Sequence, residues 1–223
     1  MAIHDSTECA SACVSVSEKA IGGRTKRVFD VMAALCAIIL LAPLLVLISA
    51  LVFVLDGGPV MIRHTRIGRG GVKFGCLKYR TMVTNGDEVL RSHLASSPEA
   101  LEEWTKTRKL VSDPRVTTLG RILRKTSLDE LPQILNIFSG EMSFVGPRPI
   151  VEDEIYKYGA AFNEYRRARP GLTGRWQVSG RNDTGYDERV ALDQHYVSNW
   201  SFTSDIEIIL LTIPAVIKAK GVY

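Results

Sequence analysis

The chain has 223 residues, a hydrophobic fraction of 46% and a formal net charge of +4. This length fits one domain with an appendage, and the composition is that of a globular protein. The small positive charge is compatible with an anionic membrane, phosphate or nucleic-acid partner. Cys9, Cys13, Cys36 and Cys76 form no CxxC pair, which argues against a disulfide framework or a structural zinc site.

The N-terminal residues 1–23 contain Ser, Ala and Gly without a periodic apolar pattern. We expect them to form a mobile tail.

The next segment, Val31–Leu55, carries no charged side chain. A membrane-spanning helix needs about 20 such residues. A signal peptide is not expected, because the run is too long, begins too late and has no small-residue cleavage site. A buried core helix would be shorter or amphipathic. The segment therefore predicts membrane insertion.

Pro43 lies in the middle of this run and divides it into halves of about 12 residues, each about 18 Å long at the rise of a helix. Neither half spans a bilayer alone. Basic residues flank the run on both sides, which favours a cytoplasmic location for both ends; they are Arg24, Lys26 and Arg27 before it, and Arg63, Arg66 and Arg69 after it. A re-entrant helix broken at Pro43 explains both features, and a kinked spanning helix is the alternative.

Short strands are predicted within Pro59–Met82, where Val60–Ile62 and Phe74–Leu77 flank the glycine-rich turn Gly68–Gly71. Three later segments are predicted to be helical. Gly86–Thr107 is polar on most faces, and Leu128–Phe138 has an apolar stripe. Ile206–Ile217 is nearly all aliphatic and would pack in the core or lie in the lipid interface.

Two adjacent carboxylates, Asp129 and Glu130, stand out in the middle of the chain. Ser127 and Glu130 match a capping box, which would give the carboxylate a purely structural role. Pro132 opposes this interpretation, since it would be the fifth residue of the helix, whereas Pro favours the first turn. If the helix began near Pro132, the two carboxylates would precede it and could hold Mg²⁺ and attack phosphorus.

Several arginines follow that could bind an anionic substrate. Two prolines fix the backbone around Arg148, which suits bidentate phosphate binding. Arg166–Gly174 and Gly180-Arg181 combine basic residues with glycines, a pattern that can cradle a pyrophosphate. A structural turn, a solvated basic face or a nucleic-acid patch are the alternatives. No Walker A, GxGxxG, HExxH or GxSxG motif and no nucleic-acid motif occurs.

Five motifs in a fixed order resemble those of the bacterial sugar transferase family, the monotopic phosphoglycosyl transferases. They are Lys26–Asp30, Lys78–Met82, Ser127–Gln133, Val145–Pro149 and Arg169–Gly174. Ser179–Asp183 and Thr212–Val216 add a likeness to the exopolysaccharide galactosyl-phosphate transferases of succinoglycan type. Tyr79 stands where many members have Phe.

The resemblance covers the chain from about Lys26 to the C-terminus, and together with the N-terminal tail it predicts an α+β fold in three parts. Residues 1–23 would be the mobile tail, and residues 24–57 a re-entrant membrane helix broken at Pro43. Residues 58–223 would form a mainly helical catalytic domain with short strands and amphipathic interfacial helices. That domain would lie on the cytoplasmic face of the bacterial inner membrane.

The resemblance also implies an activity. Asp129 would attack the β-phosphorus of a UDP-sugar, release UMP and pass hexose-1-phosphate to undecaprenyl phosphate. Glu130, together with Asp129, would hold Mg²⁺. Galactose is favoured and glucose is possible. The expected substrate-binding residues are Arg148, Arg124, Lys78, Arg80, Arg169 and Arg181. A non-catalytic membrane scaffold for polysaccharide assembly is the alternative, and no nucleic-acid partner is expected.

Overall fold

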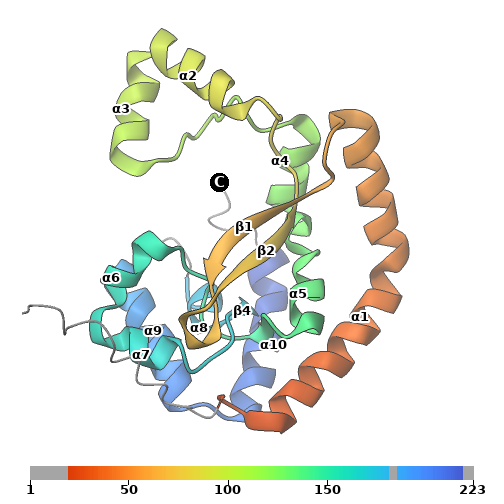
Figure 1. The fold of residues 1–223 in the computed structure, drawn as a ribbon, viewed down its shortest axis with the longest axis vertical. Helices are drawn as coiled ribbons and strands as arrows, with labels where there is room; N and C mark the ends of the chain where they lie inside the picture. Colours follow the sequence, from red (N-terminus) through yellow and green to blue (C-terminus); the bar gives the residue numbers. More distant parts are fainter. Residues whose placement is uncertain (1–19, 181–184, 218–223) are drawn as a thin grey trace, which may run out of the picture.

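The computed structural model describes residues 20–180 and 185–217 (Figure 1). Nearly all of the predicted N-terminal tail, through residue 19, lies outside the described residues. The fold is mixed, with many helices and two small sheets of two strands each. One long apolar helix runs along one side of the molecule, as Figure 1 shows.

This long helix, α1 (Gly23–Leu51), continues into a π-helical turn at Val52–Asp56. The helix is not interrupted at Pro43, so the predicted break is corrected to a proline inside one continuous element. Pro43 cannot donate a hydrogen bond to the carbonyl four residues earlier, and a helix adapts to this loss by bending. Figure 1 shows α1 bowed along its length.

The outward face of α1 is apolar and exposed. Ile39, Leu40 and Val46 are 68%, 79% and 68% exposed. Gly23–Asp56 is long and apolar enough to cross a membrane, and only 11% of its most apolar stretch is buried. This low burial argues against the core helix of a soluble protein, since such a helix is covered by its neighbours.

Strands β1 (Met61–Ile67) and β2 (Lys73–Tyr79) pair antiparallel, with His64 opposite Cys76. The turn between them contains Gly70 and Gly71 at φ 72° and 80°, a region that glycine enters without a steric penalty. The predicted hairpin is therefore confirmed, and each strand is longer than the sequence indicated.

The predicted helix at Gly86–Thr107 is instead two helices, α2 (Gly86–Ser96) and α3 (Pro98–Thr107). Ser97 separates them, because its hydroxyl accepts a hydrogen bond from the Ala100 amide and so caps the second helix. Figure 1 shows this pair as an arm that stands away from the rest of the molecule.

A second sheet joins two distant segments in parallel, β3 (Ser143–Val145) and β4 (Gly171–Thr173). Three glycines allow the two backbones to cross closely here. A Cβ atom added at Gly146, Gly171 or Gly174 would overlap backbone atoms of the opposite segment. This crossing fixes the start of the Pro147–Pro149 segment that carries Arg148.

The remaining elements complete the domain around these sheets. They are α4 (Thr118–Lys125), η3 (Leu128–Glu130), α5 (Gln133–Ser139), η4 (Glu152–Glu154), α6 (Ile155–Tyr158), η5 (Gly159–Ala161), α7 (Phe162–Tyr165), α8 (Arg175–Val178), α9 (Tyr186–Ser198) and α10 (Phe202–Ile217). In α10, Ile208 is fully buried while Leu210 and Ile213 are exposed. One face of the helix therefore packs in the core and the other is an exposed apolar surface.

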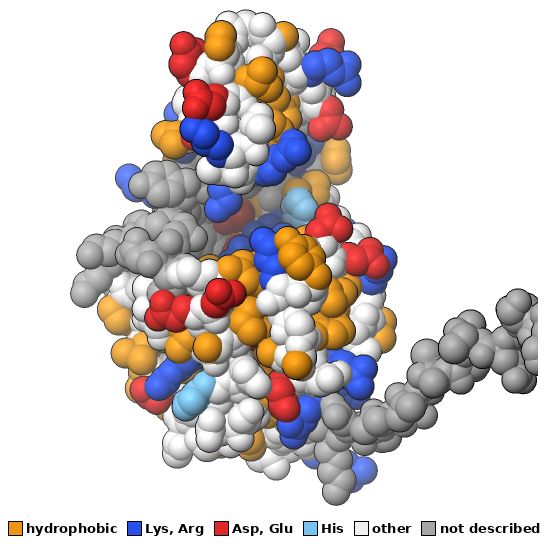
Figure 2. Space-filling view, turned by 90° about the vertical axis from the view of Figure 1, so that its left-hand side faces the viewer, with side chains coloured by type: hydrophobic (Ala, Val, Ile, Leu, Met, Phe, Trp, Pro, Cys, Tyr) orange, Lys and Arg blue, Asp and Glu red, His pale blue; other side chains and the backbone are white. Residues whose placement is uncertain are grey.

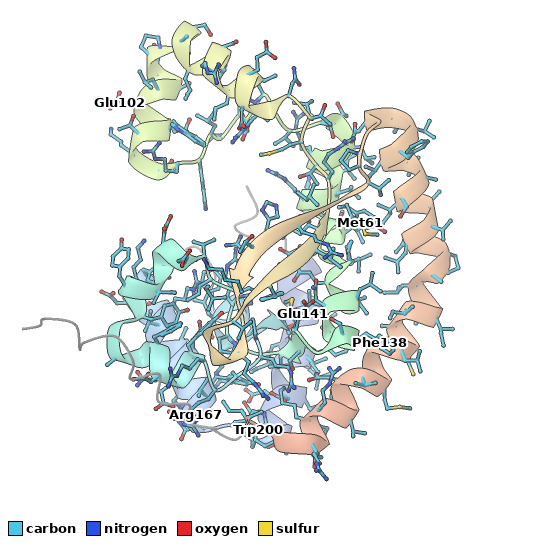
Figure 3. The ribbon with its side chains drawn as sticks, viewed as in Figure 1. Met61, Glu102, Phe138, Glu141, Arg167 and Trp200 are labelled. Atoms are coloured by element: carbon cyan, nitrogen blue, oxygen red, sulfur yellow. The ribbon has the colours of Figure 1, made fainter. Side chains whose placement is uncertain are left out.

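A buried polar network fastens the base of α1 to the domain. Lys26 forms an ion pair with Asp205 of α10, which also accepts hydrogen bonds from Tyr196 and Trp200. Asp30 accepts from Ser143 at the start of β3. Figure 3 shows Trp200 beside the start of α1. Because removing one partner of a buried ion pair leaves an uncompensated charge, the network specifies how α1 is placed.

Candidate active site

The two carboxylates lie in a single 3-10 turn, η3, and not inside an α-helix. Ser127 has left-handed backbone angles, φ 56° and ψ 17°, and its side chain caps nothing. Helix α5 begins only after Pro132, which occupies the N-cap position. The capping-box interpretation is therefore wrong. Pro132 explains why, since a proline at a helix start sacrifices no intrahelical hydrogen bond.

Lys78 of β2 meets both carboxylates. Its ammonium nitrogen lies 2.6 Å from Oε1 of Glu130 and 4.0 Å from Oδ2 of Asp129. Asp129 is buried, whereas the Glu130 side chain is one-third exposed. The hairpin and the 3-10 turn thus bring Lys78 next to two adjacent carboxylates, although Lys78 and Glu130 are 52 residues apart in the chain.

Burial raises the pKa of Asp129 above its ordinary value. The Glu130 carboxylate raises it further, while the charges of Lys78 and Arg124 lower it. A carboxylate with its hydration removed and cations beside it is held in the arrangement expected of a nucleophile or a metal ligand.

Arg124, at the end of α4, is the second cation near Asp129. Its Nε donates to the hydroxyl of Thr81 at 2.8 Å. Burial lowers its pKa, and the negative charge of Asp129 opposes this shift. Arg124 therefore contributes positive charge next to the carboxylate while Thr81 fixes its orientation.

Arg148 is held over an aromatic ring. Its guanidinium carbon lies 5.4 Å from the centroid of Trp176, and that of Arg189 lies 5.1 Å from the same centroid. The Glu130 charge acts on Arg148 and raises its pKa, although burial lowers the pKa overall. Arg148 is therefore close enough to Glu130 for the two charges to interact. The Trp176 ring fixes the plane of the Arg148 guanidinium group.

Asp193 of α9 supports Arg148 from behind. It is fully buried and accepts the Tyr158 hydroxyl at 2.7 Å, and the charges of Arg189 and Arg148 act on it. Burial raises the pKa of Asp193 to about 6. Sequence reasoning missed Trp176, Arg189 and Asp193. The only signal was the spacing of Arg189 and Asp193, four residues apart on one helix face.

Two of the other expected substrate-binding residues lie elsewhere. Arg80 is buried and donates to the backbone carbonyl of Gly57, so it ties the end of α1 to β2. Arg169 donates to the carbonyl of Gly140 at 2.8 Å, beyond the far end of α5. Arg181 lies outside the described residues.

The side-chain donors of this site suit a Mg²⁺ ion that shares its coordination with a substrate. Residues 20–180 and 185–217 contain no group of three or more His, Cys, Asp and Glu side chains that could hold a metal. Asp129 and Glu130 alone supply two carboxylates. Mg²⁺ in phosphoryl-transfer sites is commonly held by one or two carboxylates, substrate phosphates and water. The pair therefore fits that ion.

The surface beside the site is hollowed. Figure 2 shows the hollow below the α2–α3 arm, with Lys and Arg side chains gathered in it. Strand β2 and helix α4, which carry Lys78 and Arg124, lie behind it in that view. An anionic substrate would enter a region of positive potential.

The family model described as bacterial sugar transferase matches residues 21–219. The chain belongs to the bacterial sugar transferase family. The exopolysaccharide production protein ExoY of Rhizobium meliloti strain 1021 is 58% identical over 203 residues, which are 91% of this chain and 90% of that protein. The predicted resemblance is thereby confirmed.

Two relatives have names that state a reaction. The undecaprenyl-phosphate galactose phosphotransferase of Salmonella typhimurium strain LT2 is 48% identical over 198 residues, 89% of this chain and 41% of that protein. The UDP-glucose:undecaprenyl-phosphate glucose-1-phosphate transferase of Caulobacter vibrioides is 40% identical over 206 residues, 89% of this chain and 72% of that protein. As a member of this family, the chain is an enzyme of sugar-phosphate transfer.

Proposed function

We propose that the chain transfers hexose-1-phosphate from a UDP-sugar to undecaprenyl phosphate, as the membrane step that begins the assembly of an exopolysaccharide. The observation that carries the proposal is the buried Asp129 carboxylate, which caps no helix and lies beside Lys78 and Arg124. The names of the relatives support the donor and the acceptor.

The reaction proceeds in two displacements. An oxygen of Asp129 forms a bond to the β-phosphorus of the UDP-sugar, and the bond from that phosphorus to the bridging oxygen breaks. UMP leaves with the electron pair. A phosphate oxygen of undecaprenyl phosphate then attacks the same phosphorus, releases the Asp129 carboxylate and forms the diphosphate-linked sugar. Splitting the transfer in this way means that the soluble and lipid substrates never need to meet.

The cations of the site have separate tasks. Lys78 holds Glu130 and stabilises the ionised form of Asp129. Arg148, fixed over Trp176, is placed to bind the phosphates of the donor. Asp129 and Glu130 would hold Mg²⁺, which would neutralise charge on the diphosphate. Phosphoryl transfer depends mainly on such positioning and neutralisation, and these residues would supply both.

The location of the domain follows from the same proposal. Exposed apolar side chains of α1 and α10 would lie in the lipid of the bacterial inner membrane. Basic residues on both flanks of α1 favour a cytoplasmic location for both its ends, in a re-entrant arrangement. The galactose phosphotransferase is 48% identical to this chain and the glucose-1-phosphate transferase is 40% identical, which favours galactose over glucose.

The test is release of UMP from a panel of UDP-sugars by the full chain in detergent with polyprenyl phosphate and Mg²⁺. UDP-galactose is expected to give the fastest release. Asp129→Asn is expected to lower the rate at least about 1,000-fold, since an amide is a poor nucleophile toward phosphorus. Full turnover by Asp129→Asn would favour the non-catalytic scaffold.

A further inference from the structure

A cavity of about 620 Å³ opens at the base of α1, away from the carboxylate pair. Its lining includes four arginines that come from three parts of the chain: Arg24, Arg27, Arg69 and Arg169. Their convergence is a property of the fold, because nothing in the sequence places Arg69 or Arg169 near α1.

Two of the four arginines are fixed in the wall. Arg27 donates to the carbonyl of Ile137 at 2.6 Å and to that of Phe138 at 2.8 Å, at the end of α5. Arg169 donates to the carbonyl of Gly140, the residue that follows α5. These bonds hold two guanidinium groups at the rim of one cavity while leaving donors on each unused.

The other two arginines are exposed, and neither donates a hydrogen bond or forms an ion pair within the described ranges. Arg24 is in the first turn of α1. Arg69 is in the turn between β1 and β2, which a backbone bond from Gly70 to the carbonyl of Arg166 holds beside the Arg169 segment. Both side chains are free to close on a ligand.

None of the four arginines of the cavity is paired with a carboxylate in the part of the chain that the structure describes. The first turn of α1 has no acidic residue and no side-chain cap, so the positive end of the helix dipole adds to the field. Burial and the charges of Arg69 and Arg27 lower the pKa of Arg169, and the negative charge of Asp30 opposes this shift.

The cavity continues into an apolar surface. Val28 lines it and is 62% exposed. Met32, Leu35 and Ile39 follow at helical spacing on the same face of α1, and all are exposed. On α5, Phe138 is 45% exposed, and Figure 3 shows it between α5 and α1. A ligand that fits both parts has an anionic head and an apolar tail.

The cavity is separate from the candidate active site. Arg27 and Arg169 contact carbonyls at the C-terminal end of α5, whereas Asp129 and Glu130 precede its N-terminal end. The intervening helix has seven residues and is therefore about 10 Å long. A lipid phosphate bound at one end would not occupy the other.

We propose that this arginine cavity binds the phosphate of an anionic membrane phospholipid, whose acyl chains lie along the exposed face of α1. The head of the lipid would fix the depth at which the base of α1 meets the bilayer. A soluble phosphate shares the head-group chemistry but lacks the tail, and the test separates the two sources. The proposal concerns a second site and does not depend on the identity of the sugar donor.

The test is calorimetric titration of the full chain, in a neutral detergent, with dihexanoyl phosphatidylglycerol, dihexanoyl phosphatidylcholine and inorganic phosphate. The phosphatidylglycerol is expected to bind at least about 10-fold more tightly than either of the others, because each basic residue near an anionic head group contributes about fivefold. The variant Arg24→Gln with Arg69→Gln is expected to weaken this binding about 10- to 30-fold. Both side chains are exposed and unbonded, so the melting temperature should not change.

Two further variants are the controls. Arg91→Gln with Lys109→Gln removes the same charge at exposed positions on and beyond the α2–α3 arm and should leave the affinity within about twofold. Arg24→Lys with Arg69→Lys should retain most of it. The proposal is overturned if inorganic phosphate binds as tightly as the lipid, if the Arg24 and Arg69 variant binds normally, or if the charge control loses as much affinity.

Discussion

Lys78 connects the two carboxylates of the site, and its effect on Asp129 can be measured as a pH dependence. Asp129 must be ionised to act as a nucleophile, and burial raises its pKa. As the pH decreases, activity should therefore be lost at a higher pH than it would be with an aspartate of ordinary pKa. Lys78 lowers the pKa of Asp129, so Lys78→Met should move the acidic limb of kcat/KM to higher pH.

The matched control is Lys73→Met on the same strand, where the exposed lysine pairs with Glu152. It should leave the pH profile of UMP release unchanged. A Lys78→Met profile that coincides with that of the parent would show that Lys78 does not act on the nucleophile.

Asp193 acts on the site through the two arginines beside Trp176, Arg148 and Arg189, which makes it a positioning residue. Asp193→Ala removes the acceptor of the Tyr158 hydroxyl and the negative charge that acts on Arg189 and Arg148. The KM for the UDP-sugar should rise about 10-fold, since a lost buried hydrogen bond costs about 1–3 kcal/mol. Asp193→Asn keeps one acceptor oxygen and should restore most of the affinity. If Asp193→Ala lowered kcat at an unchanged KM, its role would be folding alone.

A substitution of Glu130 tests whether this residue binds Mg²⁺. Glu130→Gln removes one of the two carboxylates and should weaken the dependence of UMP release on Mg²⁺, with a half-maximal concentration at least about 10-fold higher. The measurement is a Mg²⁺ titration at saturating donor. An unchanged titration curve would remove Glu130 from the metal site.

For individual residues, only the part of the site that lies in short motifs could be predicted from the sequence. Asp129, Glu130 and Arg148 each stand in a recognisable local pattern. Trp176, Arg189 and Asp193 come from segments between 28 and 45 residues beyond Arg148, and their contact with it depends on tertiary packing. Arg80 and Arg169 matched family motifs, yet each donates to a backbone carbonyl elsewhere.

Among the secondary-structure elements, the crossing of β3 and β4 fixes the position of the segment that carries Arg148. An added methyl group at Gly146 would overlap the backbone of Arg169. Gly146→Ala should therefore lower the free energy of unfolding by about 1–3 kcal/mol, because neither backbone can move without breaking the sheet. Thermal melting in detergent measures this change.

Gly185 provides the comparison for that substitution, because nothing lies within 4 Å of an added Cβ atom there. Gly185→Ala should change stability by less than about 0.5 kcal/mol. Equal effects at the two positions would mean that the close crossing does not limit stability.

Local rules predicted the hairpin and the membrane segment, and they failed where two rules competed. At Ser127 the capping pattern competed with the proline five residues later, and the structure follows the proline. At Pro43 the rule for a helix interior predicts a break, whereas the surrounding apolar residues continue the helix through it. In both places the outcome depends on the residues in the neighbouring turns of the chain. A single short motif does not include those residues, so it cannot predict the outcome.

For the whole molecule, we propose that α1 lies in the membrane with both ends on the cytoplasmic side. Single cysteines introduced as Ser15→Cys or Val60→Cys, in a background without the four natural cysteines, should both resist an impermeant thiol reagent added to intact cells. Ser15 lies outside the described residues and reports the side reached by the N-terminal segment. Labelling of Ser15→Cys alone would establish a spanning helix.

The central claim is that Asp129 carries the sugar phosphate covalently between donor and acceptor. The most direct measurement is the mass of the intact full chain after incubation with UDP-galactose and Mg²⁺, without polyprenyl phosphate. We expect an increase equal to one hexose phosphate, located on the peptide containing Asp129, absent in Asp129→Asn and lost when polyprenyl phosphate is added. Turnover in the complete reaction, with no such adduct in a rapidly quenched sample lacking acceptor, would contradict it.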